Sequence, residues 1–231
     1  MEFSLAFIFE AFGFIPNFIM KSSGIEIQSA IPSPEGPAAV KETDHFQTCT
    51  LPRPNRYITT HDDQSGKAIY SDTVPEPVSF WHVGPKNEPA AFGLGYVTDA
   101  MPVRLTRNQD LTDFYHGHRR RKQSGLVNRG GSVLRYVDYP PRASSPMHRT
   151  VSCDYAVVLF GKMECLLDSG ERRTLNPGDT LIQRGTMHQW INLENSWSRM
   201  LYVLLDATPV DIHGEQLCEE LGGMERVLRS R

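Results

Sequence analysis

A two-residue alternation of hydrophobic and polar positions recurs along much of this chain. The alternating runs are short, rich in Val, Ile, Leu, Tyr, Phe and Thr, and bounded by Gly, Pro, Asn or Asp, as strands joined by turns are. Strands are therefore expected at residues 56–60, 67–71, 78–82, 92–98, 132–138, 155–160, 162–167, 172–175, 179–183 and 198–205. Residues 155–160 are apolar throughout, which favours a buried strand. Many short strands at regular spacing predict an all-β sandwich or barrel.

Two segments follow a helical spacing instead. Residues 106–115 predict a short helix that Thr106 or Asn108 caps at its start. The tail over residues 211–231 predicts a C-terminal helix, interrupted by the glycines at 222–223. The apolar positions at helical spacing in this tail are Leu217, Leu221, Met224 and Leu228.

The first 54 residues differ from the barrel expected over residues 55–210. Residues 1–20 are rich in Phe and Ile, but two acidic residues, a glycine and a proline interrupt them, so they fit neither a secretory signal nor a spanning helix. Three interpretations remain open: an amphipathic helix that packs on a partner, an upstream extension with the natural start at Met20, or a weak membrane anchor. Residues 21–54 are rich in Ser, Pro and Gly and predict a flexible arm.

Composition and charge narrow the class of protein. The chain has 231 residues, 39% hydrophobic and 22% charged, which is ordinary for a soluble globular protein. Its net charge of −3 gives no global electrostatic reason to bind nucleic acid, and the basic run at residues 119–122 is interpreted as a solvated loop. Four scattered cysteines indicate neither a disulfide framework nor a zinc finger, so a reducing, cytoplasmic setting is expected.

The candidate chemistry lies between residues 146 and 192. His148, Asp154 and His188 occur on short strand-like runs that glycine turns separate. His148 and Thr150 have the same parity along one strand, so their side chains are expected to face the same side. Two histidines and a carboxylate in this layout predict a small-molecule or metal pocket inside a barrel.

This segment resembles the two-motif signature of the cupins. Matches to the first motif are His148 and Gly161, with Thr150 in place of the second histidine and Asp154 in place of the glutamate. Matches to the second motif are Gly178, Asp179, Gly185, His188 and Asn192. The resemblance implies an all-β cupin fold, which is a double-stranded β-helix or jelly-roll barrel, with an N-terminal extended arm and short helices.

The altered ligand set leaves three interpretations of the site. His148, Asp154 and His188 match the two-histidine, one-carboxylate triad of non-haem iron enzymes, and imidazoles also suit Zn, Cu or Ni. Without a metal, the two histidines would act as general acid and base, and Asp154 would orient one imidazole. The third interpretation makes His188 a core histidine and Asp154 a turn residue. Further residues expected to line the substrate pocket are Thr150, Tyr136, Met187, Trp190 and Arg184.

Residues 55–61, 133–138, 146–150 and 183–188 resemble a narrower group, the single-domain cupin proteins of fungal secondary-metabolite clusters. This resemblance covers about residues 52–207. It implies a cupin-domain oxidoreductase that acts on a polyketide-derived intermediate, on a route to a salicylaldehyde-type aromatic product. Functional pairing with a polyketide synthase and with dehydrogenases is implied too, as is a homodimer that exchanges N-terminal strands. The alternative is a non-catalytic or metal-free cupin that binds, releases, isomerises or decarboxylates the intermediate.

Overall fold

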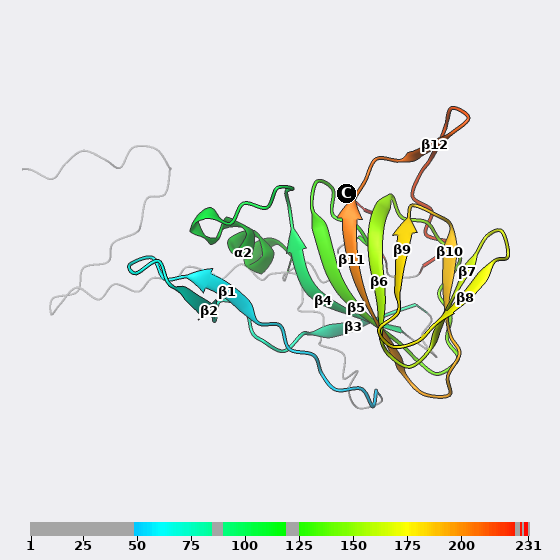
Figure 1. Cartoon of the computed structure of the whole chain (residues 1–231), viewed down its shortest axis with the longest axis horizontal. Coiled ribbons are helices and arrows are strands. Elements are labelled where there is room, and N and C mark those ends of the chain that lie inside the picture. The colour runs from blue at the N-terminus through cyan, green and yellow to red at the C-terminus, as the bar shows by residue number, and fades with distance from the viewer. Residues whose placement is uncertain (1–48, 85–89, 119–124, 225–226, 228, 231) are drawn as a thin grey trace, which may run out of the picture. The chain divides into compact units, whose positions relative to one another are not determined.

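The longest alternating runs of the sequence form an antiparallel six-stranded sheet (Figure 1). The computed structural model describes residues 49–84, 90–118, 125–224, 227 and 229–230. In spatial order, the strands of this sheet are β3 (Phe80–Val83), β4 (Ala90–Thr98), β5 (Ser132–Tyr139), β11 (Ser198–Asp206), β6 (Ser152–Phe160) and β9 (Thr180–Arg184). Every neighbouring pair is antiparallel. The all-β prediction is confirmed.

Three smaller sheets complete the strand set. The three-stranded sheet has the order β10 (His188–Asn192), β7 (Met163–Leu167) and β8 (Arg172–Leu175). The two hairpins are β1 (Ile58–His61) with β2 (Ala68–Ser71), and β12 (Val210–Ile212) with β13 (Glu215–Leu217). Each run expected to be a strand therefore forms one, because alternation and turn residues act locally along the chain.

The main core lies on the inner face of the six-stranded sheet. Along β5 and β11, alternate positions turn inward, and the register places Tyr202 opposite both Arg135 and Ala156. Tyr202 is thus at the centre of three adjacent strands. Buried members of this core include Phe92, Val133, Val137, Tyr139, Val158, Met163, Trp190, Met200 and Leu204.

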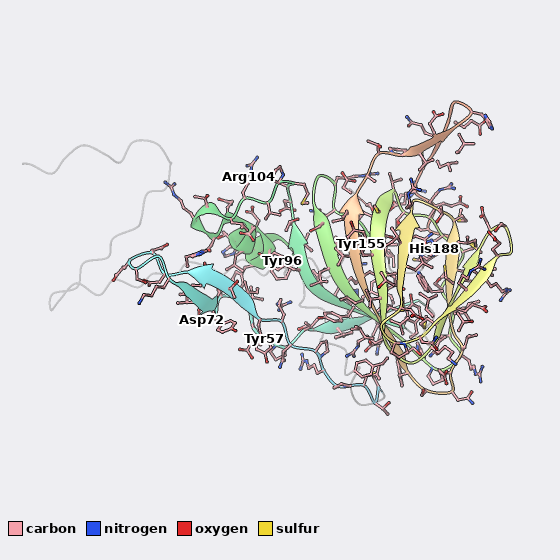
Figure 2. All side chains as sticks on the ribbon, viewed as in Figure 1. Tyr57, Asp72, Tyr96, Arg104, Tyr155 and His188 are labelled. Carbon is pink, nitrogen blue, oxygen red and sulfur yellow. The ribbon has the colours of Figure 1, made fainter. Side chains whose placement is uncertain are left out.

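The expectation of a fully buried strand at residues 155–160 is wrong for one of its two faces. Ala156 and Val158 are fully buried, whereas Tyr155 is 43% exposed and Phe160 40% exposed. Figure 2 labels Tyr155 on β6. The strand belongs to an antiparallel sheet that presents only one face to the main core, so an apolar composition on both faces does not bury both.

The helix expected at residues 106–115 forms as three short pieces, and its predicted cap is absent. These are η1 (Thr106–Asn108), α2 (Gln109–Asp113) and η2 (Phe114–His118). Asn108 adopts a left-handed conformation and its side chain caps neither piece. That side chain instead accepts a hydrogen bond from the Thr60 hydroxyl of β1. Leu111 and Phe114 are buried against the core.

The predicted C-terminal helix is wrong where the structure describes the tail. Residues 210–217 form the β12–β13 hairpin instead, with His213 and Gly214 both at positive φ in its turn. Two consecutive residues with positive φ are the turn that antiparallel strands prefer, and it overrides the helical spacing of the apolar residues. Gly222 and Gly223 also have positive φ, which ends any helix there.

Several sequence expectations fall outside the described residues. These are the apolar segment at residues 1–20, most of the arm at residues 21–54 and the basic run at residues 119–122. Among the residues that the structure describes, no helix is both long and apolar enough to cross a membrane.

Gly161, which ends the first cupin motif, is expected to tolerate no side chain. Its φ is 76°, and an added Cβ would overlap the Ser198 side chain and lie 3.0 Å from the Ser198 Cα. Gly161→Ala should therefore lower the free energy of unfolding by about 2–3 kcal/mol, which urea denaturation would measure. The matched control is Gly170→Ala, at φ 89° with open space around the new methyl, which should lose about 1 kcal/mol. Equal losses in the two variants would contradict a steric cause.

Candidate active site

A cavity of about 420 Å³ opens at the inner face of the six-stranded sheet. Its walls come from β4, β5, β6 and β11 of that sheet, from β10 of the smaller sheet, and from the C-terminal segment. Most of the wall is apolar or aromatic. The polar side chains in it are Arg135, Arg142, Ser144, Ser145, His148, Thr150, Asp154 and His188, with the hydroxyls of Tyr139 and Tyr202. A cavity of this size and composition suits a small, largely apolar ligand with a few polar groups.

His148 and His188 lie side by side in the wall of this cavity. Their backbones exchange two hydrogen bonds, of 2.8 and 2.9 Å, and their ring centroids lie 4.3 Å apart. Figure 2 labels His188 on β10. The Nδ1 atoms lie 2.9 Å from the carbonyl oxygens of Pro146 and Thr186 respectively. Because a carbonyl only accepts, each Nδ1 carries the proton, and each Nε2 is left as the basic atom.

Burial keeps both imidazoles neutral. It lowers the pKa of His148, which is 6% exposed. Burial and the neighbouring His148 together lower the pKa of His188 to about 3. Two buried cations at this separation would repel each other, so at neutral pH both rings are proton acceptors through Nε2.

Asp154 lies on β6, within the wall of the same cavity, so its interpretation as a turn residue is wrong. The Ser152 hydroxyl donates to Thr150 Oγ1 at 2.8 Å, and Thr150 Oγ1 donates to Asp154 Oδ2 at 3.3 Å. The other oxygen, Oδ1, is buried and has no hydrogen-bond partner among the described residues. Burial raises the pKa of Asp154 to about 6, against the hydrogen bonds and the charge of Arg135, which lower it.

The predicted three-ligand metal site does not form from these side chains. No three His, Cys, Asp or Glu residues in the described part of the chain come close enough together to hold an ion. The two histidines are close, but the Asp154 carboxylate is engaged through Thr150, which stands where the cupin motif has a second histidine. Aspartate is also one methylene shorter than the motif's glutamate. The donor set present therefore does not fit a two-histidine, one-carboxylate triad.

The remaining predicted pocket residues divide between the cavity and other places. Thr150 and Trp190 line the cavity. Tyr136 faces the opposite side of β5, where it packs with Val78, Phe80 and Ala91. Arg184 is exposed at the end of β9 and lines a separate pocket of about 190 Å³. Met187 is half-buried in the segment before β10, outside the cavity wall. These three residues do not line the cavity. For Tyr136 the reason is that period-two alternation turns it to the face of β5 opposite to Arg135 and Val137, which line the cavity.

Arg135 is a buried, charged residue of the cavity wall that the sequence did not indicate. It is 1% exposed, its Nη2 donates to the Gly125 carbonyl at 2.9 Å, and its guanidinium lies 4.8 Å from the Phe92 ring centroid. Burial lowers the pKa of Arg135 to about 10, and the charge of Asp154 opposes this. Both faces of β5 are buried, because Asp138 on the other face is also enclosed. Polarity along the strand therefore could not tell which charged residue faces the cavity.

No family model matches the chain, but relatives in fungi do. "Phomopsin biosynthesis cluster protein D" of Diaporthe leptostromiformis is 41% identical over 178 residues, covering 77% of this chain and 88% of that protein. "Cupin-domain-containing oxidoreductase fogC" of Aspergillus ruber is 35% identical, covering 82% and 90%. "Cupin-domain-containing oxidoreductase virC" of Hypocrea virens is 36% identical, covering 73% and 84%.

Among solved structures, a Cupin 2 conserved barrel domain protein from Salinispora arenicola is 26% identical with a TM-score of 0.31, covering 33% of this chain and 64% of that chain. That overlap is too small to argue from, and the assignment rests on the fungal relatives. The antiparallel barrel with a histidine pair in its cavity defines a cupin. The chain belongs to the family of cupin-domain-containing oxidoreductases of fungal biosynthesis clusters.

The raised pKa of Asp154 predicts a pH-dependent contribution to stability. Its folded pKa of about 6 lies above the ordinary 3.8, so the folded protein holds this proton more tightly than the unfolded chain does. That stabilisation is complete below the unfolded pKa and is lost as the pH rises through the folded one. Relative to Asp154→Asn, the protein should lose up to about 3 kcal/mol of unfolding free energy between about pH 4 and pH 7. Urea denaturation of both proteins across this range measures it, and a constant difference would contradict it.

Proposed function

We propose that this cupin acts as an oxidoreductase on a polyketide-derived intermediate, on a route to a salicylaldehyde-type aromatic product, and that the reaction takes place in the 420 Å³ cavity. The observation that carries the proposal is the convergence of two neutral histidines and a buried carboxylate on one largely apolar cavity. An aromatic wall of Trp190, Tyr202 and Phe92 suits a flat ligand. Membership of the oxidoreductase family supports the reaction class.

The histidines would handle the proton of this reaction. With Nδ1–H donated to a backbone carbonyl, Nε2 of His148 or His188 can accept a proton from a substrate hydroxyl. Asp154, with a pKa of about 6, can exist in either protonation state near neutral pH and so can exchange a second proton.

A second function is supported by the donor set itself. Thr150 occupies the position of a motif histidine, and the three expected ligands do not form a metal-binding group in the described residues. These facts favour a non-catalytic or metal-free cupin that binds, releases, isomerises or decarboxylates the intermediate. Functional pairing with a polyketide synthase and dehydrogenases, and a homodimer, also belong to the proposal.

Direct assay separates the two functions. The purified protein is incubated with 2-hydroxybenzyl alcohol and, separately, with its carboxylate-bearing analogue 3-(hydroxymethyl)salicylate, with molecular oxygen and then with a nicotinamide cofactor as electron acceptor, and the aldehyde product is followed by mass spectrometry. Parallel samples are first reconstituted with iron, zinc, copper or nickel, and their bound metal is measured. Conversion at more than the background rate supports the oxidoreductase. Binding of the alcohol without conversion under every condition favours the accessory function.

A further inference from the structure

A buried positive charge stands in the wall of the proposed substrate cavity. Arg135 is 1% exposed and projects from β5 into the cavity that also contains His148 and His188. Among the described residues that line this cavity, the acidic side chain is Asp154 of β6.

The two charged side chains are staggered along the barrel wall. Arg135 pairs with Tyr202 across β5 and β11, while Asp154 pairs with Leu204, two residues further along β11 on its other edge. Neighbouring strands lie about 4.8 Å apart and residues about 3.4 Å apart along a strand, so two strand spacings and a two-residue stagger put the two backbones about 12 Å apart. A ligand with polar groups at both ends can therefore lie between them.

An independent sign of a ligand comes from Asp154. This side chain is 4% exposed, and its Oδ1 has no hydrogen-bond partner in the part of the chain that the structure describes. A buried oxygen without a donor is destabilising, and structures in which it persists commonly supply the donor from a bound molecule. The hydroxyl of a ligand in the cavity would supply it here.

We propose that Arg135 anchors the substrate, and that the substrate carries a planar anionic pair of oxygens, either a carboxylate or the enolate of a 1,3-dicarbonyl. This inference rests on the proposed function, because it assumes that the 420 Å³ cavity is the substrate site. A guanidinium is planar and presents parallel N–H donors, which match two oxygens on one side of a planar anion. Phe92 holds one face of this guanidinium, at 4.8 Å from the ring centroid. A hydroxyl elsewhere on the ligand would donate a hydrogen bond to Oδ1 of Asp154.

Binding of matched small probes tests the inference. Salicylate presents a carboxylate, 2-acetylcyclohexane-1,3-dione presents an enolate, and salicylamide is a neutral analogue of salicylate. Dissociation constants are measured by calorimetry on the full chain and on the variants Arg135→Met, Arg135→Lys and Arg184→Met. The Arg184→Met variant is the matched control, because Arg184 is an exposed arginine outside the cavity. Thermal melting of each variant checks that it is folded.

The expected result is selective. The unaltered protein should bind at least one of the two anions about tenfold or more tighter than salicylamide, and Arg135→Met should weaken that anion about 10- to 100-fold. The affinity of Arg135→Met for salicylamide should change less than about threefold. The affinity of Arg135→Lys for the anion should lie between those of the unaltered protein and Arg135→Met, and the affinity of Arg184→Met should equal that of the unaltered protein. The anion that depends on Arg135 identifies which of the two substrate chemistries applies. If Arg135→Met does not fold, Arg135→Lys tests the inference in its place and should show a several-fold loss of the preference for the anion over salicylamide.

Three outcomes would overturn the inference. Equal affinity of the unaltered protein for anions and salicylamide would remove Arg135 as the anchor and leave the proposed function standing. An anion preference that survives in folded Arg135→Met, or in folded Arg135→Lys where Arg135→Met does not fold, would do the same. Binding of none of the three probes would count against both the anchor and the cavity as the substrate site.

Discussion

Replacing His188 by alanine is expected to lower turnover about 10²- to 10⁴-fold while the barrel stays folded. His188 is 3% exposed, its Nδ1–H is held by the Thr186 carbonyl, and its Nε2 is the proton acceptor that burial keeps neutral. His148 has the same geometry with Pro146. Since the two rings act as a pair 4.3 Å apart, the double variant should lose little more than either single variant.

The measurement is the rate of product formation for His148→Ala, His188→Ala and the double variant, using whichever conversion the direct assay detects. Met187→Leu is the control, because Met187 directly precedes His188 but lies outside the cavity wall; it should retain activity within about twofold. Thermal melting confirms folding. Retained activity in both single variants would remove the histidines from the reaction and favour the accessory function.

Arg199→Met is expected to lower the free energy of unfolding by about 3–5 kcal/mol. Arg199 is 1% exposed and Asp138 fully buried, and the guanidinium donates to both carboxylate oxygens, at 2.5 and 2.7 Å. A third donor, Nη1 of Arg199, forms a hydrogen bond of 2.6 Å with the Pro52 carbonyl and so attaches the segment before β1 to the six-stranded sheet. Methionine would leave the Asp138 carboxylate buried without its bidentate partner, which is far more unfavourable than losing an exposed pair.

Urea denaturation compares Arg199→Met with the control Arg129→Met. Arg129 forms an ion pair with Asp206 at 3.0 Å, but the Arg129 side chain is 41% exposed and the Asp206 side chain 26% exposed. That control should lose less than about 1 kcal/mol, because water screens the pair. The double variant Arg199→Met with Asp138→Leu should recover part of the loss, since it leaves no unpaired buried charge. A loss in Arg199→Met no greater than in Arg129→Met would contradict this account.

Much of the fold was predictable because its signals are local. Alternation and turn residues predicted every strand of the six-stranded sheet, and the motif matches at His148, Gly161 and His188 predicted a cupin. Gly161 closes a turn at positive φ. Asn192, the last motif residue, donates through Nδ2 to the carbonyls of Tyr139, Pro140 and Ser196 and accepts from Ser198, so its role is structural. A motif match alone does not separate such a residue from a catalytic one.

The predictions failed where backbone angles or distances between strands decide the structure. The tail has apolar residues at helical spacing, yet the positive φ angles of His213 and Gly214 turn it into a hairpin. The carboxylate of the expected metal triad is engaged through Thr150 in the folded barrel. Neither outcome can be obtained from the spacing of residue types, because each depends on backbone angles or on distances between strands.

The sequence by itself determined the strands of the six-stranded sheet, the cupin family and the placing of His148 and His188 in one site, since these depend on local periodicity and motif spacing. Only the tertiary structure decided which side chains of β5 reach that site. Arg135 and Asp138 are both charged and both buried, on opposite faces of this strand. One faces the cavity and the other binds Arg199, because β5 lies between two apolar layers and alternation alone cannot say which layer encloses the substrate.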